Sequence, residues 1–127
     1  MARILCVDDE PAALSLKKEI LEQAGYAVTT AVSVKDALQH LENVDYDAIV
    51  TDWRFEEGEG RTIVEAAKSR FSIPVVVVSG YVGEAFHAAE PLADIYIEKP
   101  ADSRELLQIL KILLEVKTNK VNKSLNR

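Results

Sequence analysis

Residues 3–9 read RILCVDD, so an apolar run ends in two adjacent aspartates, Asp8 and Asp9. Two later apolar runs also end in a charged residue: Asp52 follows DAIVT, and Lys99 follows DIYIE. Short apolar runs that alternate with amphipathic segments predict parallel strands joined by helices. Because the carboxyl ends of parallel strands share one edge of a sheet, we expect these four side chains to converge there.

Predicted strands and helices alternate along the chain. The first helix begins at Pro11, which suits a first helical turn, and stops at Gly25, with Leu14 and Leu16 on its apolar side. The run Val75–Val78 is β-branched throughout, which predicts a central strand buried on both faces. The predicted strands are residues 3–7, 26–31, 47–51, 75–78 and 94–98, and the predicted helices are residues 11–24, 34–41, 61–70, 83–90 and 102–116.

This order of elements predicts a (βα)5 architecture. It is a doubly wound α/β fold with a five-stranded parallel sheet in the strand order 2-1-3-4-5. Right-handed crossovers then place helices one and five on one face and helices two, three and four on the other. We expect one domain over residues 1–116, followed by a basic, flexible C-terminal tail at residues 117–127.

Composition and charge exclude several classes of function. The net charge is −6, and since residues 117–127 contain only basic charges, the rest of the chain is more acidic still, which argues against direct nucleic-acid binding. No apolar stretch has membrane-spanning length, and no signal peptide precedes the first strand. The single Cys6 lies in an apolar strand, so we expect a buried, inert thiol and a reducing, cytoplasmic setting.

The converging charges suggest a chemistry. Clustered carboxylates repel one another, so a cation must lie among them or one must be protonated, and Mg²⁺ is the natural occupant of such an oxygen site. The Asp52 carboxylate could accept a phosphoryl group, with Lys99 as a point charge for a phosphoryl oxygen. The simpler alternatives are that Asp8 and Asp9 cap the first helix, that Asp52 caps the third, and that Lys99 is a solvated strand-end charge.

Taken together, these residues and three others resemble the response-regulator receiver domains of two-component signal transduction, a CheY-like family with a flavodoxin-like fold. The resemblance covers residues 3–116 and depends on Asp8, Asp9, Asp52, Ser79, Tyr96, Lys99 and Pro100. It implies that a phosphohistidine on a sensor histidine kinase or a histidine phosphotransfer protein donates the phosphoryl group to Asp52. The domain would catalyse only its own phosphorylation and dephosphorylation, and so would not be an enzyme in the usual sense.

The resemblance also implies roles for individual residues. Asp9 would bind Mg²⁺ directly, Asp8 mostly through water, and Asp52 would supply a third oxygen. The backbone carbonyl two residues after the nucleophile, here Arg54, would complete the protein ligands. Lys99 would contact one phosphoryl oxygen.

A conformational switch is implied as well. The Ser79 hydroxyl would donate to a phosphoryl oxygen and move the loop at residues 79–83. The space vacated would admit Tyr96, which would turn from an exposed position to an inward-facing one. Such a change couples a local charge event to a bistable element and so would switch a partner-binding face.

Two rival functions remain open. A Mg²⁺-dependent phosphohydrolase with an aspartyl nucleophile requires a second acid, two residues after that nucleophile, as its general acid. Arg54 occupies that position instead. A receiver-like interaction module that is never phosphorylated would be marked by the loss of an acid or of Lys99, and neither is lost.

Further features concern the loop after Asp52 and the last helix. Glu56 stands where receivers usually carry a proline, although Gly60 keeps the later glycine, and we expect Trp53 at the mouth of the pocket. The last helix is unusually apolar, because Ile109, Ile112 and Val116 extend its buried stripe around one side. An exposed apolar patch usually indicates a partner, so we predict a homodimer or output contact on the face formed by helix four, strand five and helix five.

Overall fold

The structure is a computed structural model that describes residues 1–55, 58–80, 93–99 and 102–125. The parallel strands of its main sheet are β1 (Arg3–Val7), β2 (Ala27–Ala31), β3 (Ala48–Thr51), β6 (Val75–Ser79) and β7 (Ile95–Glu98). They lie in the order β2-β1-β3-β6-β7. Since β6 and β7 are the fourth and fifth strands of this sheet, the predicted order 2-1-3-4-5 is confirmed.

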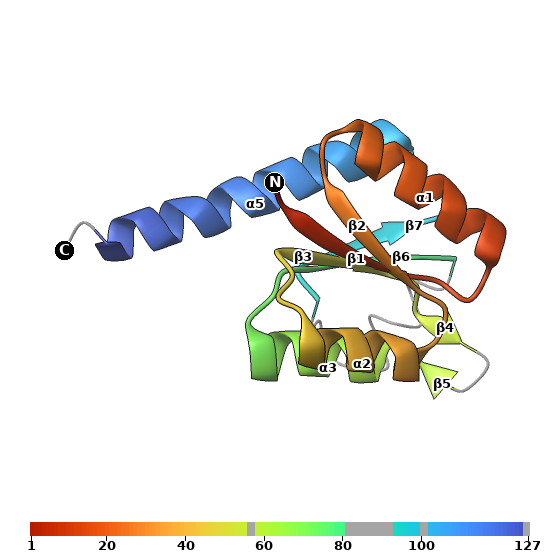
Figure 1. Cartoon of the computed structure of the whole chain (residues 1–127). Helices are drawn as coiled ribbons and strands as arrows, with labels where there is room; N and C mark the ends of the chain where they lie inside the picture. Colours follow the sequence, from red (N-terminus) through yellow and green to blue (C-terminus); the bar gives the residue numbers. More distant parts are fainter. Residues whose placement is uncertain (56–57, 81–92, 100–101, 126–127) are drawn as a thin grey trace.

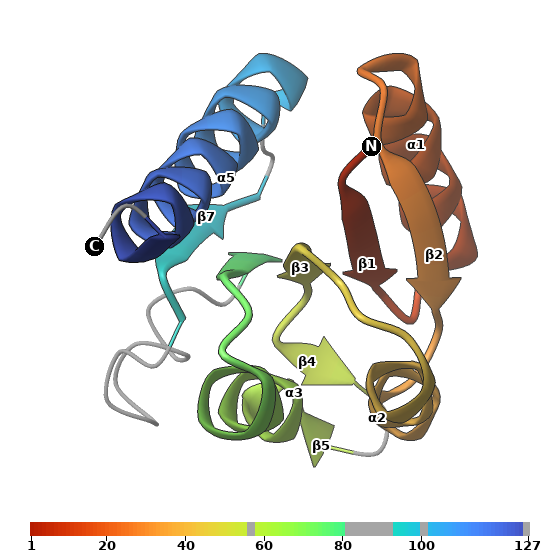
Figure 2. The same ribbon diagram turned by 60° about the vertical axis from the view of Figure 1, so that its left-hand side comes forward.

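Helices cover both faces of the sheet. They are α1 (Pro11–Gln23), α2 (Val34–Asn43), α3 (Arg61–Ala66), which continues as a π-helical turn η1 (Ala67–Phe71), and α5 (Ser103–Leu125). Figures 1 and 2 show α1 and α5 on one face and α2 and α3 on the other, as the right-handed crossovers require. The helix predicted at residues 83–90 lies outside the described residues.

The alternation of side chains along each strand explains this three-layer arrangement. Successive residues of a strand point to opposite faces, so an unbroken apolar run serves two cores at once. One apolar cluster, under α2 and α3, contains Leu5, Val7, Ile49, Val75 and Val77. The other, under α1 and α5, contains Ile4, Cys6, Val50, Val76 and Val78.

Cys6 lies on the α1 and α5 side of β1 and is fully buried. Burial raises the pKa of its thiol to about 12, with the Lys17 ammonium acting weakly in the opposite direction. Because the thiolate is the reactive form, Cys6 is a packing residue, as the sequence predicts. Among the described residues, none of the helices combines the length and the apolar character that crossing a membrane requires.

Two sequence predictions about the helices are wrong. The last helix does not end near Val116 but continues to Leu125, so residues 117–125 are helical and α5 projects beyond the sheet (Figure 1). That stretch contains neither Gly nor Pro, the residues that most readily interrupt a helix. Leu16 is 58% exposed rather than buried, because it lines a groove between α1 and α5 instead of reaching the sheet.

Candidate functional site

The backbone ladder of the sheet fixes the residues that follow its strands. The amide of Asp8 donates to the carbonyl of Ala31 at 3.1 Å, and the amide of Asp52 donates to the carbonyl of Val7 at 3.0 Å. On the far side of the sheet, the amide of Lys99 donates to the carbonyl of Ser79 at 3.0 Å. Each charged residue is therefore held at the same edge by a hydrogen bond that extends the strand pairing by one residue.

Three carboxylates meet at this edge. Asp8, Asp9 and Asp52 each offer an oxygen that lies within 4.8 Å of the others, although Asp9 is exposed while Asp8 and Asp52 are 0% and 9% exposed. One oxygen of each buried acid is held by the backbone: Asp8 Oδ1 accepts from the Glu10 amide at 3.0 Å, and Asp52 Oδ1 from the Trp53 amide at 2.7 Å. The second oxygen of each buried acid is left for a cation.

Lys99 supplies one such cation. Its Nζ donates to Asp52 Oδ2 at 2.9 Å and lies 3.4 Å from Asp8 Oδ2, so residues far apart in the sequence are bridged directly. Burial alone would lower the pKa of the Lys99 ammonium, but the hydrogen bond to Asp52 and the charges of both carboxylates together raise it. The lysine is therefore charged at neutral pH and matched to the acids around it.

The site also contains a second lysine, Lys17, which sequence reasoning missed. Lys17 Nζ, from the second turn of α1, donates to Asp8 Oδ2 at 3.0 Å, and its side chain is only 13% exposed. Burial alone would raise the pKa of Asp8, but the backbone hydrogen bond from Glu10 and the ammoniums of Lys17 and Lys99 hold it below its usual value. The sequence pattern points to no role for Lys17 at the site, and only its positive charge could have signalled an acidic partner.

Helix capping does not explain the acids. The N-cap residue of α1 is Glu10, which makes no side-chain capping bond, and the N-cap residue of α3 is Gly60. Asp8 contacts the amide that leads into α1, yet its other oxygen contacts two lysines. Nor is Lys99 a solvated strand-end charge, since it contacts Asp8 and Asp52.

Ser79 and Tyr96 are the two residues of the predicted switch, and the starting position of Tyr96 differs from the predicted one. Ser79 is fully buried at the end of β6, one strand away from β3, and its carbonyl holds the Lys99 amide. Tyr96 lies mid-strand in β7 and is half-buried, with its phenol oxygen accepting from the Ala93 amide at 3.3 Å. The expectation that Tyr96 starts from an exposed position is therefore wrong; its ring already packs against the cluster under α2 and α3. Pro100 lies outside the described residues.

The chain after Asp52 forms a small antiparallel hairpin that the sequence did not predict. Its strands are β4 (Arg54–Phe55) and β5 (Gly58–Glu59), with Arg54 opposite Glu59. The hairpin returns the chain to Gly60, whose amide donates to the carbonyl of Trp53. A Cβ at Gly60 would lie 2.6 Å from the backbone oxygen of Asp52, so only glycine fits there without a shift. Glu56 lies outside the described residues, and the metal role of the Arg54 carbonyl stays a prediction.

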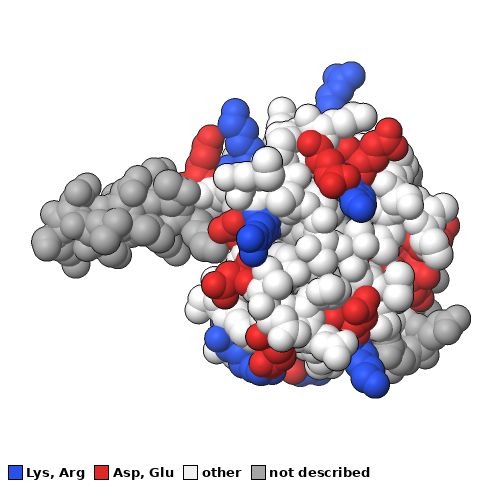
Figure 3. Space-filling view, in the orientation of Figure 1, with Lys and Arg blue, Asp and Glu red and all other residues white. Residues whose placement is uncertain are grey.

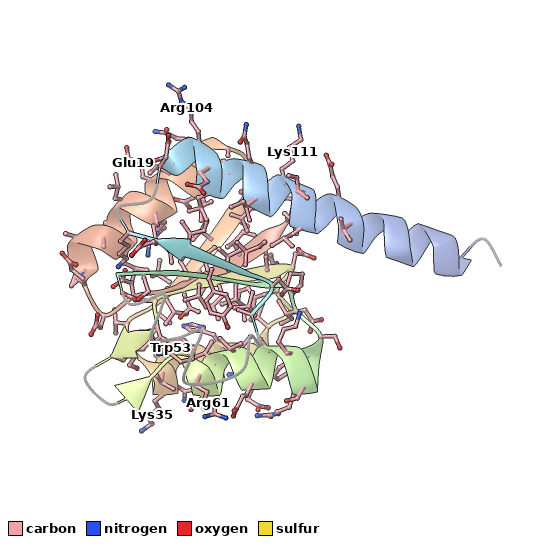
Figure 4. The ribbon with its side chains drawn as sticks, turned by 180° about the vertical axis from the view of Figure 1, so that it is seen from behind. Glu19, Lys35, Trp53, Arg61, Arg104 and Lys111 are labelled. Carbon is pink, nitrogen blue, oxygen red and sulfur yellow. The ribbon has the colours of Figure 1, made fainter. Side chains whose placement is uncertain are left out.

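Trp53 does not lie at the mouth of the site. It is 1% exposed and belongs to the apolar cluster that also contains Phe55 and Ile63, between the sheet and the α2 and α3 layer (Figure 4). Its indole Nε1 has no hydrogen-bond partner within the part of the chain that the structure describes. The prediction failed because the Trp53 side chain points into the apolar cluster, whereas the side chain of its neighbour Asp52 joins the acidic cluster at the edge of the sheet.

Known proteins share both this sequence pattern and this architecture. The family model of the response regulator receiver domain matches residues 4–111. The response regulator SaeR of Staphylococcus aureus is 35% identical over 121 residues, which cover 92% of this chain and 53% of that protein. A CheY-like receiver domain from Methanospirillum hungatei has a TM-score of 0.86 at 32% identity, covering 94% of this chain and 98% of the other.

A third relative is the response regulator TrrA of Thermotoga maritima, solved in complex with Mg²⁺ and BeF. It has a TM-score of 0.81 at 30% identity, covering 89% of this chain and 99% of that one. The family match extends over most of the chain, so this chain belongs to the response regulator receiver domain family of two-component systems. It spans about half the length of SaeR.

The close approach of Gly60 to Asp52 yields a prediction about stability. We expect Gly60→Ala to destabilise the fold by about 1–3 kcal/mol, because the new methyl group must displace the Asp52 carbonyl or the hairpin. Gly80→Ala is the matched control: a Cβ there meets no atom of the described residues within 4 Å, so the change should stay within about 0.5 kcal/mol. Urea unfolding of both variants measures the difference, and equal midpoints would contradict the proposed crowding.

Proposed function

We propose that this domain is a phosphoacceptor that takes a phosphoryl group from a phosphohistidine onto Asp52 and thereby switches a partner-binding face. The observation that supports the proposal most directly is the contact between Lys99 Nζ and Asp52 Oδ2 at 2.9 Å, beside two further acids. Asp52 is nearly buried, yet its carboxylate is at the edge of the sheet where a donor can approach. The donor would be a sensor histidine kinase or a histidine phosphotransfer protein.

The donor set at this edge fits a divalent cation. Carboxylate oxygens are the ligands that Mg²⁺ prefers, and the lowered pKa of Asp8 keeps that ligand ionised at neutral pH. Asp8, Asp9 and Asp52 would hold the ion, with the Arg54 carbonyl as a fourth protein ligand. When bound, Mg²⁺ would neutralise charge on the phosphoryl oxygens. The TrrA relative was solved with Mg²⁺ and BeF, which supports this assignment.

The residues of the chain then divide the work of phosphoryl transfer. The Asp52 carboxylate attacks phosphorus, an oxygen–phosphorus bond forms, and the phosphorus–nitrogen bond to the donor imidazole breaks. Lys99 gives up part of its contact with Asp52 to a phosphoryl oxygen, and Ser79 donates its hydroxyl to another. Such transfer depends on positioning and charge, which the extended ladder at Asp52 and Lys99 provides.

The remaining properties follow from the family and the surface. A receiver domain is not an enzyme in the usual sense, and the arginine at position 54 disfavours the rival phosphohydrolase, which needs an acid there. Acidic and basic side chains are interspersed on the face seen in Figure 3, which supports a protein partner rather than nucleic acid. The single buried thiol fits a reducing compartment, so we propose a cytoplasmic location.

Acetyl phosphate tests the acceptor. Incubation with acetyl phosphate and Mg²⁺ should add one phosphoryl group to the wild type, because a small acyl phosphate can replace the histidine donor. Asp52→Asn should lose the adduct, and a chelator should prevent it in the wild type. Intact-mass spectrometry measures the outcome.

Asp45→Asn is the matched control for that experiment, since Asp45 is an exposed acid in the segment that leads into β3, at the opposite end of that strand from Asp52. It should be modified as the wild type is. An adduct that persists in Asp52→Asn, or no adduct under any condition, would contradict the proposed chemistry.

The switch is tested separately. With Mg²⁺ and beryllofluoride as a phosphoryl mimic, we expect the Ser79 hydroxyl to donate to fluoride and the half-buried Tyr96 ring to become fully buried. A crystal structure of the complex measures both changes. Ser79→Ala should still bind beryllofluoride but leave Tyr96 where it is. A wild-type complex with Ser79 and Tyr96 unmoved would rule the switch out.

The surface of α5 provides the partner-binding face. Ile112 and Val116 are 59% and 48% exposed and lie one turn apart, whereas Ile109 packs partly into the core cluster below. Because α5 continues well beyond the sheet, a second copy of the chain could cover this stripe along an extended helix. We therefore favour a homodimer over an output partner as the occupant of the stripe.

The dimer is tested by sedimentation velocity with and without Mg²⁺ and beryllofluoride. We expect beryllofluoride to promote a dimer in the wild type, and the double change Ile112→Asn with Val116→Asn to return it to monomer. Leu16→Asn is the matched control, as an exposed leucine on α1, and should dimerise normally. A wild type that stays monomeric at every concentration would exclude the homodimer and leave the output partner.

A further inference from the structure

Lys17 is a charged residue of this site to which the proposed phosphoacceptor chemistry assigns no role. It comes from α1 rather than from a strand end, and its ammonium contacts Asp8 Oδ2 at 3.0 Å. The same oxygen lies 3.4 Å from the Lys99 ammonium, so two cations share one carboxylate oxygen. Lys99 has a second partner in Asp52, whereas Asp8 is the partner that Lys17 has among the residues that the structure describes.

This contact occupies the oxygen that a metal would need. Asp8 Oδ1 already accepts from the Glu10 amide, so Oδ2 is the oxygen through which Asp8 joins the acidic cluster. The Lys17 side chain is 13% exposed and the Asp8 side chain 1%, so water screens their attraction poorly. A divalent cation that approaches Asp8 must therefore displace this ammonium or bind beside it against its repulsion.

We propose that Lys17 is a built-in cation that competes with Mg²⁺ for Asp8 and so sets the metal affinity of the site. The inference rests on the metal site of the proposed function, and it adds that Lys17 regulates the affinity of that site for Mg²⁺. While no metal is bound, Lys17 balances the charge of the buried carboxylate. When a metal binds, the ammonium moves away from Asp8 Oδ2.

The structure offers a place for the displaced ammonium. A groove of about 500 Å³ lies between α1 and α5, and Lys17 is part of its lining. Two acids, Glu10 and Asp102, line the same groove, so the groove offers carboxylates to a displaced ammonium. Leu16 and Ile20 supply apolar lining against which the methylene groups can lie. The displacement therefore requires a change of side-chain rotamer but no unfolding of α1.

Mg²⁺ titration of the unphosphorylated protein, by calorimetry, tests the competition. Lys17→Met keeps most of the side-chain length without the charge and should bind Mg²⁺ at least about tenfold more tightly than the wild type. Lys17→Arg keeps the charge and should bind within about twofold of the wild type. Lys18→Met is the matched control, because it removes a neighbouring exposed charge from the same helix, and it should also stay within about twofold. Equal or weaker binding by Lys17→Met would overturn the proposal.

A second measurement keeps the proposal testable if Lys17→Met does not fold. In the wild type, the NMR signals of the Lys17 Nζ and Cε should shift as Mg²⁺ saturates the protein, because the ammonium loses its contact with Asp8. The signals of Lys18 should stay unchanged. A Lys17 signal that is constant up to saturation would show that the ammonium is not displaced, and would overturn the proposal.

The two proposals can fail independently. If Lys17→Met binds Mg²⁺ more tightly while neither protein accepts phosphate from acetyl phosphate, the competition holds and the phosphoacceptor function fails. If Asp52 is phosphorylated as proposed but the three variants bind Mg²⁺ alike, the function holds and the role of Lys17 is wrong.

Discussion

The charge balance at the carboxyl edge of the sheet is the constraint on which the site depends. A parallel sheet with helices on both faces brings Asp8, Asp9 and Asp52 within 4.8 Å of one another, where three negative charges repel. Asp8 is fully buried, and a buried carboxylate without partners would destabilise the fold by several kcal/mol. The Glu10 amide and two ammoniums offset that penalty. The contacts that stabilise the folded domain therefore also occupy the carboxylate oxygens of Asp8 and Asp52 that a metal ion would use.

The parts of this arrangement that the sequence predicted are those that depend on local pattern. Unbroken apolar runs specify strands that are buried on both faces, and the residue after each run must lie at the edge of the sheet, which places Asp8, Asp52 and Lys99 together. Lys17 escaped prediction because its contact depends on how far α1 is rotated over the sheet and on which rotamer the side chain takes. The end of α5 was missed for a related reason: the apolar stripe that defined the helix stops near Val116, while the backbone needs no stripe to stay helical.

The segment after Asp52 shows how the site is tied to the core. Trp53 packs into the cluster under α2 and α3, its amide holds Asp52 Oδ1, and its carbonyl accepts from Gly60. Trp53, whose side chain is buried, is thus hydrogen-bonded through its backbone to both Asp52 and Gly60. A movement of the Asp52 carboxylate would be resisted on its Oδ1 side by these hydrogen bonds. Within the described part of the chain, its Oδ2 side is held by the Lys99 side chain, which can change rotamer. When the charge at the site changes, we therefore expect the lysine side chains to move rather than the backbone.

The two sides of the sheet differ in what can respond to the site. Tyr96 packs against the cluster under α2 and α3, so the proposed movement of Ser79 would reach that layer through β7. Lys17 belongs to α1 on the opposite layer and lines a groove that is partly open. Because the sheet separates these residues, a movement of Lys17 on metal binding and a movement of Tyr96 on phosphorylation, as proposed, would not have to occur together. A partner that contacts α1 and the groove would then sense whether the acidic site holds a cation, and one that contacts β7 and α5 would sense whether Asp52 carries phosphate.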